Sequence, residues 1–422
     1  MNVKSITAGA THLRRRVDAQ YEVQSQSGTQ AQNIVANYRL ELISDVASFA
    51  SQWQEFEKRA IGTLFQSHKW ISSWLRTAAA AKHEHPLIVA GYDASEQLAF
   101  ILPFAMVTKS ADRSSAATLT WLGSDQTSYN LGIYRPDVMT ALTGSDLRAI
   151  IDHVAQNRTN VKAVTFTNQP LIWEGVANPM AALPQHPAHG SSYELELQQD
   201  FAEIYEEKFS GRSRSTLRRK ERQLAKQGNV RTDVASSKEQ RLKFFKIFAE
   251  QKAAQFAEHG IQNFLDDPVT NAFYLDLVNG NENDPIFEQS YTQVGNEVAA
   301  TFNGLAFKDR FYFIQTSMTL GPLRKWSPGL LVMKQNVAWA CERGLKHFDL
   351  GPGQGSHKAA WHGNEIKMFD TYIPLRAAGL PSILGHIVLA RAIHFAKTHK
   401  AIATAARSFR KIIRLAKAKI GR

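Results

Sequence analysis

The residues most suited to binding a phosphorylated ligand are Ser327-Pro328-Gly329, which follow two apolar stretches. Ser327 is a preferred N-cap residue, and Pro328 suits the first helical position because its missing N–H would have no partner there. The first four N–H groups of such a helix have no internal partner and lie at the positive end of the helix dipole. The spacing therefore predicts a helix from Pro328 whose N-terminus either binds a phosphate or pyrophosphate or is an ordinary capped end.

A predicted β-hairpin positions this helix. The stretches Glu297 to Phe307 and Arg310 to Ser317 are rich in aromatic and β-branched residues, and Lys308-Asp309 between them suits a two-residue turn. An apolar helical face follows, and Gly344 favours the end of the helix. The next apolar stretch, which ends at Phe348-Asp349-Leu350-Gly351, predicts a strand that leads into a glycine-rich turn.

The stretch from Glu297 to Trp361 resembles the GNAT acyltransferase superfamily, in the branch of CelD-like acetyltransferases that is linked to cellulose and exopolysaccharide biosynthesis. That branch is itself similar to the FemAB peptidyltransferases. Its motif residues correspond here to Ser327, Pro328, Gly329, Gly344, Phe348, Asp349, Leu350, Gly351, Gly353, Lys358 and Trp361. His357 stands where the family has Tyr. Arg324 to Gly329 is the best match to the family's pyrophosphate loop, with Ser327 in place of its first Gly.

The resemblance implies an α/β (α+β) fold of tandem GNAT-like halves, with mixed central sheets flanked by helices. The second half would bind acetyl-CoA or another acyl-CoA as the donor. The amine or hydroxyl of a small-molecule or saccharide acceptor would attack the thioester directly, while backbone N–H groups on a splayed strand stabilise the oxyanion. The implied function is an acyl-CoA-dependent N- or O-acyltransferase, most simply an acetyltransferase, with polysaccharide biosynthesis as its setting.

Site residues follow from the same resemblance. The donor is expected to contact Arg324, Ser327, Pro328, Gly329, Gly351 and Gly353. Asp349 is the candidate general base or acceptor anchor, and the alternative is a structural aspartate that caps the glycine-rich turn. Lys358 is assigned to a phosphate or to the acyl carbonyl, with a solvated lysine as the alternative. The acceptor is expected to contact Arg214, Arg218, Arg219, His357 and Trp361.

The segment from Lys208 to Lys226 is locally the most basic. Leu217 and Leu224 lie seven residues apart, which predicts a helix with one narrow buried stripe and a broad charged face. That face is either solvated or binds an anion. The segment is similar to one beside the acceptor groove of the same families. Arginine there would bind phosphates of CoA, of a nucleotide-linked sugar or of tRNA, because its planar fork matches phosphate oxygens.

Two other functions stay open. A FemAB-like transferase would take its acyl group from aminoacyl-tRNA, and the basic helix would then contact tRNA phosphates. This function ranks second because no long coiled-coil arm, which some FemAB members carry, is visible between the halves. A non-catalytic accessory protein of polysaccharide synthesis would use the fold only for binding.

Composition and pattern divide the chain into four segments. They are a disordered segment at 1–37, an N-terminal GNAT-like half at 38–192, a C-terminal acyltransferase half at 193–376 and a basic amphipathic helical tail at 377–422. The apolar pair at 86–107 matches the pair at 291–307 in pattern, which favours two similar halves.

The net charge of +12 belongs mainly to the tail, because no acidic residue follows Asp370. The single cysteine, Cys341, excludes an internal disulfide and fits a reducing compartment. No histidine joins a cluster at zinc-ligand spacing, so no metal is expected. No stretch has the length of a membrane span, which predicts a cytoplasmic protein. From Ala401 on, an apolar stripe between cations favours either docking on the protein or peripheral contact with an anionic membrane.

Overall fold

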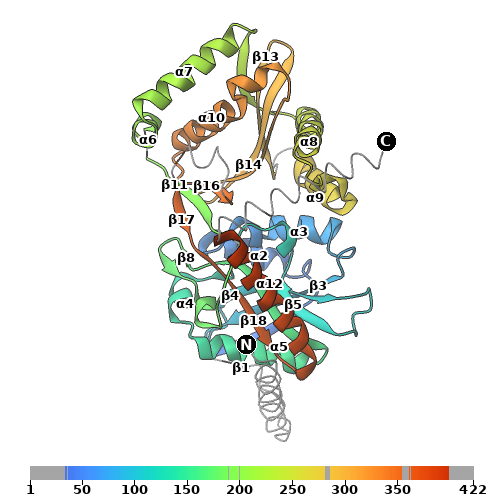
Figure 1. The fold of residues 1–422 in the computed structure, drawn as a ribbon. Helices are drawn as coiled ribbons and strands as arrows, with labels where there is room; N and C mark the ends of the chain where they lie inside the picture. The colour runs from blue at the N-terminus through green and yellow to red at the C-terminus, as the bar shows by residue number, and fades with distance from the viewer. Residues whose placement is uncertain are drawn as a thin grey trace, which may run out of the picture. The chain divides into compact units, whose positions relative to one another are not determined.

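The computed structural model describes residues 34–35, 37–188, 190–198, 200–280, 286–353, 361 and 363–398 of the chain (Figure 1). These residues form two compact units. Unit 1 holds 34–75, 79–190 and 367–398, and unit 2 holds the other described residues. The second half predicted at 193–376 therefore differs from unit 2 at its C-terminal end, because the strand after residue 367 belongs to unit 1.

Unit 1 is built on a mixed sheet with the strand order β1-β2-β3-β4-β5-β7-β18-β10, and β6 also pairs with β4. The strands are β1 (Ile34–Val35), β2 (Tyr38–Ile43), β3 (Glu84–Tyr92), β4 (Leu98–Thr108), β5 (Ala117–Trp121), β6 (Ile133–Tyr134), β7 (Val161–Pro170), β10 (His186–Pro187) and β18 (Met368–Pro374). Neighbouring strands are antiparallel except β5 and β7, which are parallel. A short separate ribbon pairs β8 (Ile172–Trp173) with β9 (Val176–Ala177).

Residues 129–132, which lie directly before β6 (Ile133–Tyr134), form no strand. Side chains hold the preceding residues in an irregular path instead. Gln66 Nε2 donates to the carbonyl of Tyr129 at 3.0 Å, and Thr127 Oγ1 donates to Asn130 Oδ1 at 2.9 Å. Local bonds of this kind compete with the regular ladder of a sheet.

The helices of unit 1 are α2 (Ala50–Arg59), α3 (His68–Thr77), α4 (Pro136–Ala141), α5 (Gly144–Asn157) and α12 (Leu380–Thr398). The short 3-10 turns are η1 (Leu64–Gln66), η2 (Ser124–Gln126), η3 (Pro179–Ala182) and η6 (Ala377–Gly379). Helix α12 packs on the sheet, where Ile383 and Ala390 are buried beside Ala163 and Tyr372. The first part of the predicted tail is therefore a docked helix.

Both ends of the chain reach beyond the described residues. Residues 399–422, which carry the predicted amphipathic stripe, lie outside them, so membrane contact by the tail stays a prediction. Residues 1–33 and 36 of the segment predicted to be disordered also lie outside, whereas Ile34–Val35 pair with β2. Among the helices that the structure describes, none has the length and apolarity needed to cross a membrane.

Unit 2 has a mixed sheet with the order β12-β13-β14-β15-β16-β11-β17. The strands are β11 (Ser192–Glu196), β12 (Val230–Val234), β13 (Glu288–Val294), β14 (Glu297–Phe307), β15 (Arg310–Met318), β16 (His347–Pro352) and β17 (Asn364–Ile366). The helices are α6 (Phe201–Lys208), α7 (Gly211–Ala225), α8 (Lys238–His259), α9 (Pro268–Asn279) and α10 (Pro328–Glu342), with 3-10 turns η4 (Phe264–Asp266) and η5 (Pro322–Trp326). The predicted hairpin is confirmed as β14 and β15, and the predicted helix as α10.

Alternating side chains give the sheet of unit 2 two different faces. Phe302, Phe311 and Phe348 pack with α6, α7 and α10 in one core. On the opposite face, Tyr291 stacks on Phe244 of α8 with ring centroids 3.8 Å apart. Figure 1 shows α8 and α9 on the side of the sheet opposite α10. The helices of both faces therefore bury the apolar period-2 pattern of the strands.

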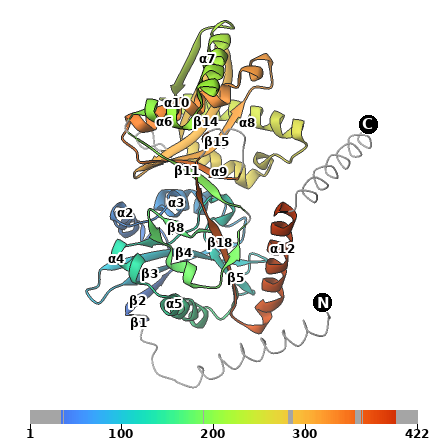
Figure 2. The same cartoon turned by 60° about the vertical axis from the view of Figure 1, so that its left-hand side comes forward.

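The two sheets share one topology. Figures 1 and 2 draw their strands from two sides. The path β2-β3-β4-β5-β7-β18-β10 in unit 1 corresponds strand by strand to β12-β13-β14-β15-β16-β11-β17 in unit 2. In each path, the fourth and fifth strands are parallel and a helix connects them. The two sheets exchange their sixth strands. In the chain, the sixth strand of each sheet follows the seventh strand of the other sheet: β11 follows β10, and β18 follows β17. The predicted α/β fold of tandem halves with mixed sheets flanked by helices is thus confirmed.

Candidate functional site

The N-terminus of α10 lacks the side-chain cap that the sequence predicts. Ser327 lies in the left-handed region, with φ 55° and ψ 54°, and its side chain makes no capping bond. An N-cap residue needs extended backbone for that bond. Instead, Ser327 Oγ accepts a hydrogen bond from Lys220 Nζ of α7 at 2.6 Å. The first turn of α10 contains no acidic residue, so the positive end of the helix dipole and an ammonium group lie together.

Apolar packing holds α7 against this end of α10. Leu224 of α7, Leu323 of η5 and Leu331 of α10 are buried together in one cluster. Leu217, one heptad before Leu224, is buried in the main core of unit 2. The predicted narrow stripe on α7 is therefore confirmed, and it fixes which charged side chains of α7 lie beside α10.

Strands β15 and β16 separate close to the start of α10. Their parallel ladder contains the pairs Arg310 with His347, Phe311 with Phe348 and Tyr312 with Asp349. Beyond Tyr312, β15 continues to Met318 without a described strand on that edge, while β16 turns to pair with β11 alone. Parallel strands end at the same edge of a sheet, and α10 starts at that edge. The structure thus shows the splayed strand that the family resemblance implies.

Asp349, the candidate general base, is the last residue of the ladder with β15. Its side chain is only 1% exposed, and its Oδ1 accepts a hydrogen bond from the N–H of Gly351 at 2.6 Å. Gly351 and Gly353 have φ values of 71° and 83°, which suit glycine. The candidate general base is therefore buried among the described residues. Its position favours the alternative, in which the carboxylate holds the glycine-rich turn.

A buried charge cluster supports the first two rungs of the same ladder. Arg310 is 3% exposed and forms an ion pair with Glu194 of β11, and His347 Nδ1 lies 3.6 Å from the Glu194 carboxylate. Burial disfavours the charge on Arg310, but Tyr312, Glu194 and Asp349 outweigh it, so the pKa of the guanidinium is raised. The cluster joins β11, β15 and β16 at the point from which the strands separate.

Several other predicted site residues make contacts with neighbouring side chains of the protein. Arg324 forms an ion pair with Glu258 of α8, with N–O distances of 2.7 and 2.8 Å. Arg214 pairs with Glu206 at 3.0 Å. Trp361 is 1% exposed, and its ring meets Phe209 edge-on at 4.8 Å. Trp361 is therefore part of the hydrophobic core of unit 2.

The remaining predicted residues divide into three groups. Pro328 and Gly329 form the first turn of α10, and a Cβ on Gly329 would meet only Met318 Sδ, at 3.8 Å. Arg218 and Arg219 are exposed on α7. His357 and Lys358 lie outside the described residues.

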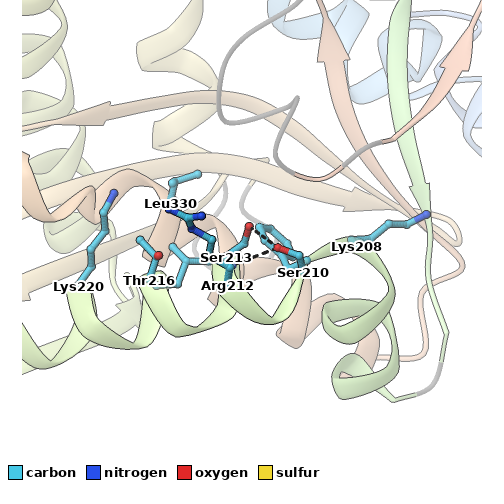
Figure 3. Close-up of a pocket in the computed structure, with 9 residues that line it drawn as sticks. Lys208, Ser210, Arg212, Ser213, Thr216, Lys220 and Leu330 are labelled. Carbon is cyan, nitrogen blue, oxygen red and sulfur yellow. Dashed lines mark hydrogen bonds between the residues drawn. The ribbon is translucent and has the colours of Figure 1, made fainter.

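A cavity of about 410 Å³ lies between α7 and the first turn of α10 (Figure 3). It is lined by Lys208, Phe209, Ser210, Arg212, Ser213, Thr216, Leu217, Lys220 and Leu330. The sequence did not single out Arg212, Thr216 and Lys220, although they recur every four residues and so share one face of a helix. We call this cavity the α7 pocket. No group of three or more His, Cys, Asp or Glu side chains in the described part of the chain has the arrangement of a metal site.

Comparisons with known proteins agree with this geometry. Residues 211–359 match the family model described as acetyltransferase (GNAT) domain. The matched range runs from the start of α7 to just beyond β16 and contains the splayed strands and α10. Unit 2 therefore contains a region that is similar to GNAT acetyltransferase domains. A search of curated proteins found no match.

Solved structures show the fold. The crystal structure of FemX is 11% identical, with a TM-score of 0.56, and the match covers 79% of this chain and 98% of FemX. A conserved protein of unknown function from Bacteroides thetaiotaomicron is 9% identical, with a TM-score of 0.50, and the match covers 79% of this chain and 99% of that one. These proteins share the two-unit architecture, and the predicted CelD-like branch stays a prediction.

Proposed function

We propose that unit 2 transfers an acyl group, most simply acetyl, from acyl-CoA to an amine or hydroxyl of a small-molecule or saccharide acceptor. The observation that carries this proposal is the short parallel ladder, which ends after Tyr312 and Asp349 beside the uncapped start of α10. The thioester of acyl-CoA supplies the electrophilic acyl carbon.

The start of α10 fits the diphosphate of the donor. The positive end of its dipole favours an anion, and Lys220 adds a positive charge at Ser327. Gly329 leaves room for a close approach to the backbone. The edge of β15 beyond Tyr312 presents backbone groups toward the space that β16 leaves, and N–H groups there suit a developing oxyanion.

Asp349 enters the proposal as a positioning residue, because its bond to the Gly351 N–H shapes the end of β16. Lys358 enters as the contact to a donor phosphate or to the acyl carbonyl, as the family resemblance implies. An acceptor amine also has to lose one proton, and acid–base catalysis of that step requires a group near the splayed strands. Substituting Lys358 by Ala should lower turnover in folded protein, and unchanged turnover would remove it from the proposal.

The proposal is tested by binding and by transfer. Calorimetry with acetyl-CoA should show one site per chain. Release of the CoA thiol in the presence of amine and hydroxyl acceptors can be followed with a thiol reagent, because Cys341 is 4% exposed and burial raises the pKa of its thiol to about 11. If neither acetyl-CoA nor longer acyl-CoAs bind, acyl-CoA is not the donor.

A second candidate function is transfer from aminoacyl-tRNA. Arg218, Arg219 and Arg222 are exposed on α7, and exposed arginines on one helix suit the phosphates of an RNA backbone. Binding of tRNA that weakens linearly with the logarithm of salt concentration, together with transfer that needs aminoacyl-tRNA, would support this candidate. Transfer from acetyl-CoA without tRNA would rule it out.

A further inference from the structure

We infer that the α7 pocket binds a phosphate ester carried on a nucleotide-sized organic group, with Arg212 as its principal cation. The inference rests on the proposed function only in placing the donor diphosphate at the start of α10. It adds a second anion-binding position to that site. Figure 3 shows Lys220, Thr216 and the guanidinium of Arg212 on the side of α7 that faces Leu330.

The lining of the pocket is positive and rich in donors. Its three charged side chains, Lys208, Arg212 and Lys220, are all cations. Three hydroxyl groups belong to Ser210, Ser213 and Thr216, and none of the described residues that line the cavity carries a carboxylate. Cations and hydroxyl donors around a cavity without an acid match an anionic ligand.

Neighbouring cations differ in how they are paired. Arg214 pairs with Glu206 at 3.0 Å, and Lys334 pairs with Glu221 at 2.8 Å. Lys208 also has a carboxylate partner, Glu207, at 2.8 Å. In the described part of the chain, Lys220 bonds to the Ser327 hydroxyl and no carboxylate pairs with Arg212. The cations that face the pocket from α7 are thus the ones without an acidic partner.

The pocket extends away from α10 along α7. Arg212, Thr216 and Lys220 lie on one face over two helical turns, which spans roughly 12 Å. Lys220 marks the end next to Ser327, and Arg212 marks the end next to Ser210, whose hydroxyl caps α7 by accepting from the Ser213 N–H at 3.2 Å. A ligand whose diphosphate lies at α10 therefore reaches Arg212 with a more distant anionic group.

The size and the apolar lining describe the rest of the ligand. At about 410 Å³, the cavity lies within the usual range for small-molecule sites and is larger than one phosphate needs. Phe209, Leu217 and Leu330 provide apolar surface beside the cations. A phosphate ester with a ribose, a base or a sugar attached fits both properties. Such a group is present in CoA, as its 3′-phosphate, and in a nucleotide-linked sugar acceptor.

Three probes separate these sources in calorimetry at one fixed salt concentration. They are CoA, dephospho-CoA, which lacks the 3′-phosphate, and UDP-glucose. The variant is Arg212→Gln. Its matched control is Arg222→Gln, which removes the same charge from an exposed position of α7 outside the pocket. Circular dichroism checks that both variants fold, which we expect because both side chains are exposed.

If the pocket binds the donor, the wild type binds CoA roughly tenfold more tightly than dephospho-CoA, because dephospho-CoA lacks the charge-assisted contact of the 3′-phosphate. Arg212→Gln then removes this difference in affinity, and Arg222→Gln keeps it. If it binds the acceptor, CoA and dephospho-CoA bind equally, and Arg212→Gln weakens UDP-glucose roughly tenfold. Equal affinities of the two variants for every probe would overturn the inference. UDP-glucose binding that depends on Arg212 without any CoA binding would keep the pocket and refute the proposed donor.

Discussion

The two parallel β–α–β segments of the molecule occupy equivalent places in their sheets but differ at the helix N-terminus. In unit 1, α5 lies between β5 and β7 and begins with a capping box. Thr143 N–H donates to Asp146 Oδ2 at 2.9 Å, and Asp146 N–H donates to Thr143 Oγ1 at 3.2 Å. In unit 2, α10 lies between β15 and β16 and has neither a side-chain cap nor an acid in its first turn.

The parallel strand pairs of the two units also differ, in how much of the first strand is paired with the second. The ladder of β5 and β7 runs from Ala117 to Thr120, almost the whole length of β5. The ladder of β15 and β16 stops at Tyr312, and β15 continues to Met318. One topology thus gives a closed segment, whose helix end is capped by its own side chains, and an open segment, whose helix end has no side-chain cap. We therefore propose unit 2, and not unit 1, as the copy that binds the donor.

The largest effect on stability is expected at the first residue pair of the parallel ladders. Unit 1 starts with Ala117 opposite Val161, whereas unit 2 starts with Arg310 opposite His347. Arg310→Met should lower the free energy of unfolding by about 3–5 kcal/mol, because it leaves the half-buried Glu194 without its counter-charge. Urea unfolding followed by circular dichroism measures this loss.

The control is the double variant Arg310→Met with Glu194→Gln, which removes both charges. It should recover part of the loss, since neutral partners avoid an uncompensated buried charge. A single variant as stable as the wild type would show that the cluster does not hold β15 and β16 together.

The second test uses the buried carboxyl group of Glu84 in unit 1 and measures how stability depends on pH. Glu84 of unit 1 is 6% exposed and accepts from Trp74 Nε1 at 3.0 Å and from Gly123 N–H at 2.9 Å. Burial raises the pKa of its carboxyl from the ordinary 4.5 to about 7. The folded state therefore holds the proton more tightly, and stability from this group is full below pH 4.5 and lost as the pH rises through 7. The loss should reach about 3 kcal/mol.

Glu84→Gln keeps a neutral polar group and should remove that part of the pH dependence. Unfolding of the wild type and the variant at pH 5 and pH 8 measures it, with the exposed Glu55→Gln as the control. An equal decline in stability between the two pH values in the wild type and in Glu84→Gln would assign the decline to other groups.

The third test compares the two helix ends as binding sites. Gly329→Glu places a carboxylate in the first turn of α10, where the added Cβ has room. It should raise the dissociation constant for acetyl-CoA at least roughly tenfold, because a negative charge repels the diphosphate. Ser145→Glu makes the same kind of change in the first turn of α5, at an exposed position, and should leave the constant unchanged. Equal effects of the two variants would contradict the assignment of the donor to α10.

The smallest effect concerns capping itself. Thr143→Ala should lower the free energy of unfolding by about 1 kcal/mol, because it removes the side-chain half of the capping box. Ser327→Gly should be neutral or slightly stabilising, because Ser327 does not cap α10 and glycine tolerates φ 55° better. Thermal unfolding of both variants measures the difference. A larger loss for Ser327→Gly than for Thr143→Ala would reverse the comparison.

Local pattern explains why much of the fold was predictable. The turn at Lys308-Asp309 and the start of α10 at Pro328 depend on neighbouring residues, so the sequence predicts them correctly. The exchange of β11 and β18 depends on pairing between distant residues, such as Thr371 with Phe166, and no local pattern encodes that choice.

The same limit explains the site. The sequence predicts the helix end at Ser327 and the basic helix at 208–226 separately, but Lys220 and Ser327 are 107 residues apart, and only tertiary packing brings them together. Arginines occur on several sides of α7, so composition alone does not distinguish Arg212, which lines the pocket, from Arg219, which does not. Trp361 matches a family motif, yet a motif does not separate a core tryptophan from one that contacts a substrate.

The exchanged sixth strands determine the order in which synthesis can complete each half. Every strand of the second sheet lies between Ser192 and Ile366, in one continuous stretch of chain. The first sheet needs Met368–Pro374 to join β7 and β10, which otherwise have no common neighbour. Because a ribosome releases the N-terminus first, the half that emerges earlier is the one that closes later. Until β18 arrives, the edge of β7 exposes unpaired backbone groups, so the nascent chain needs protection there from pairing with another molecule.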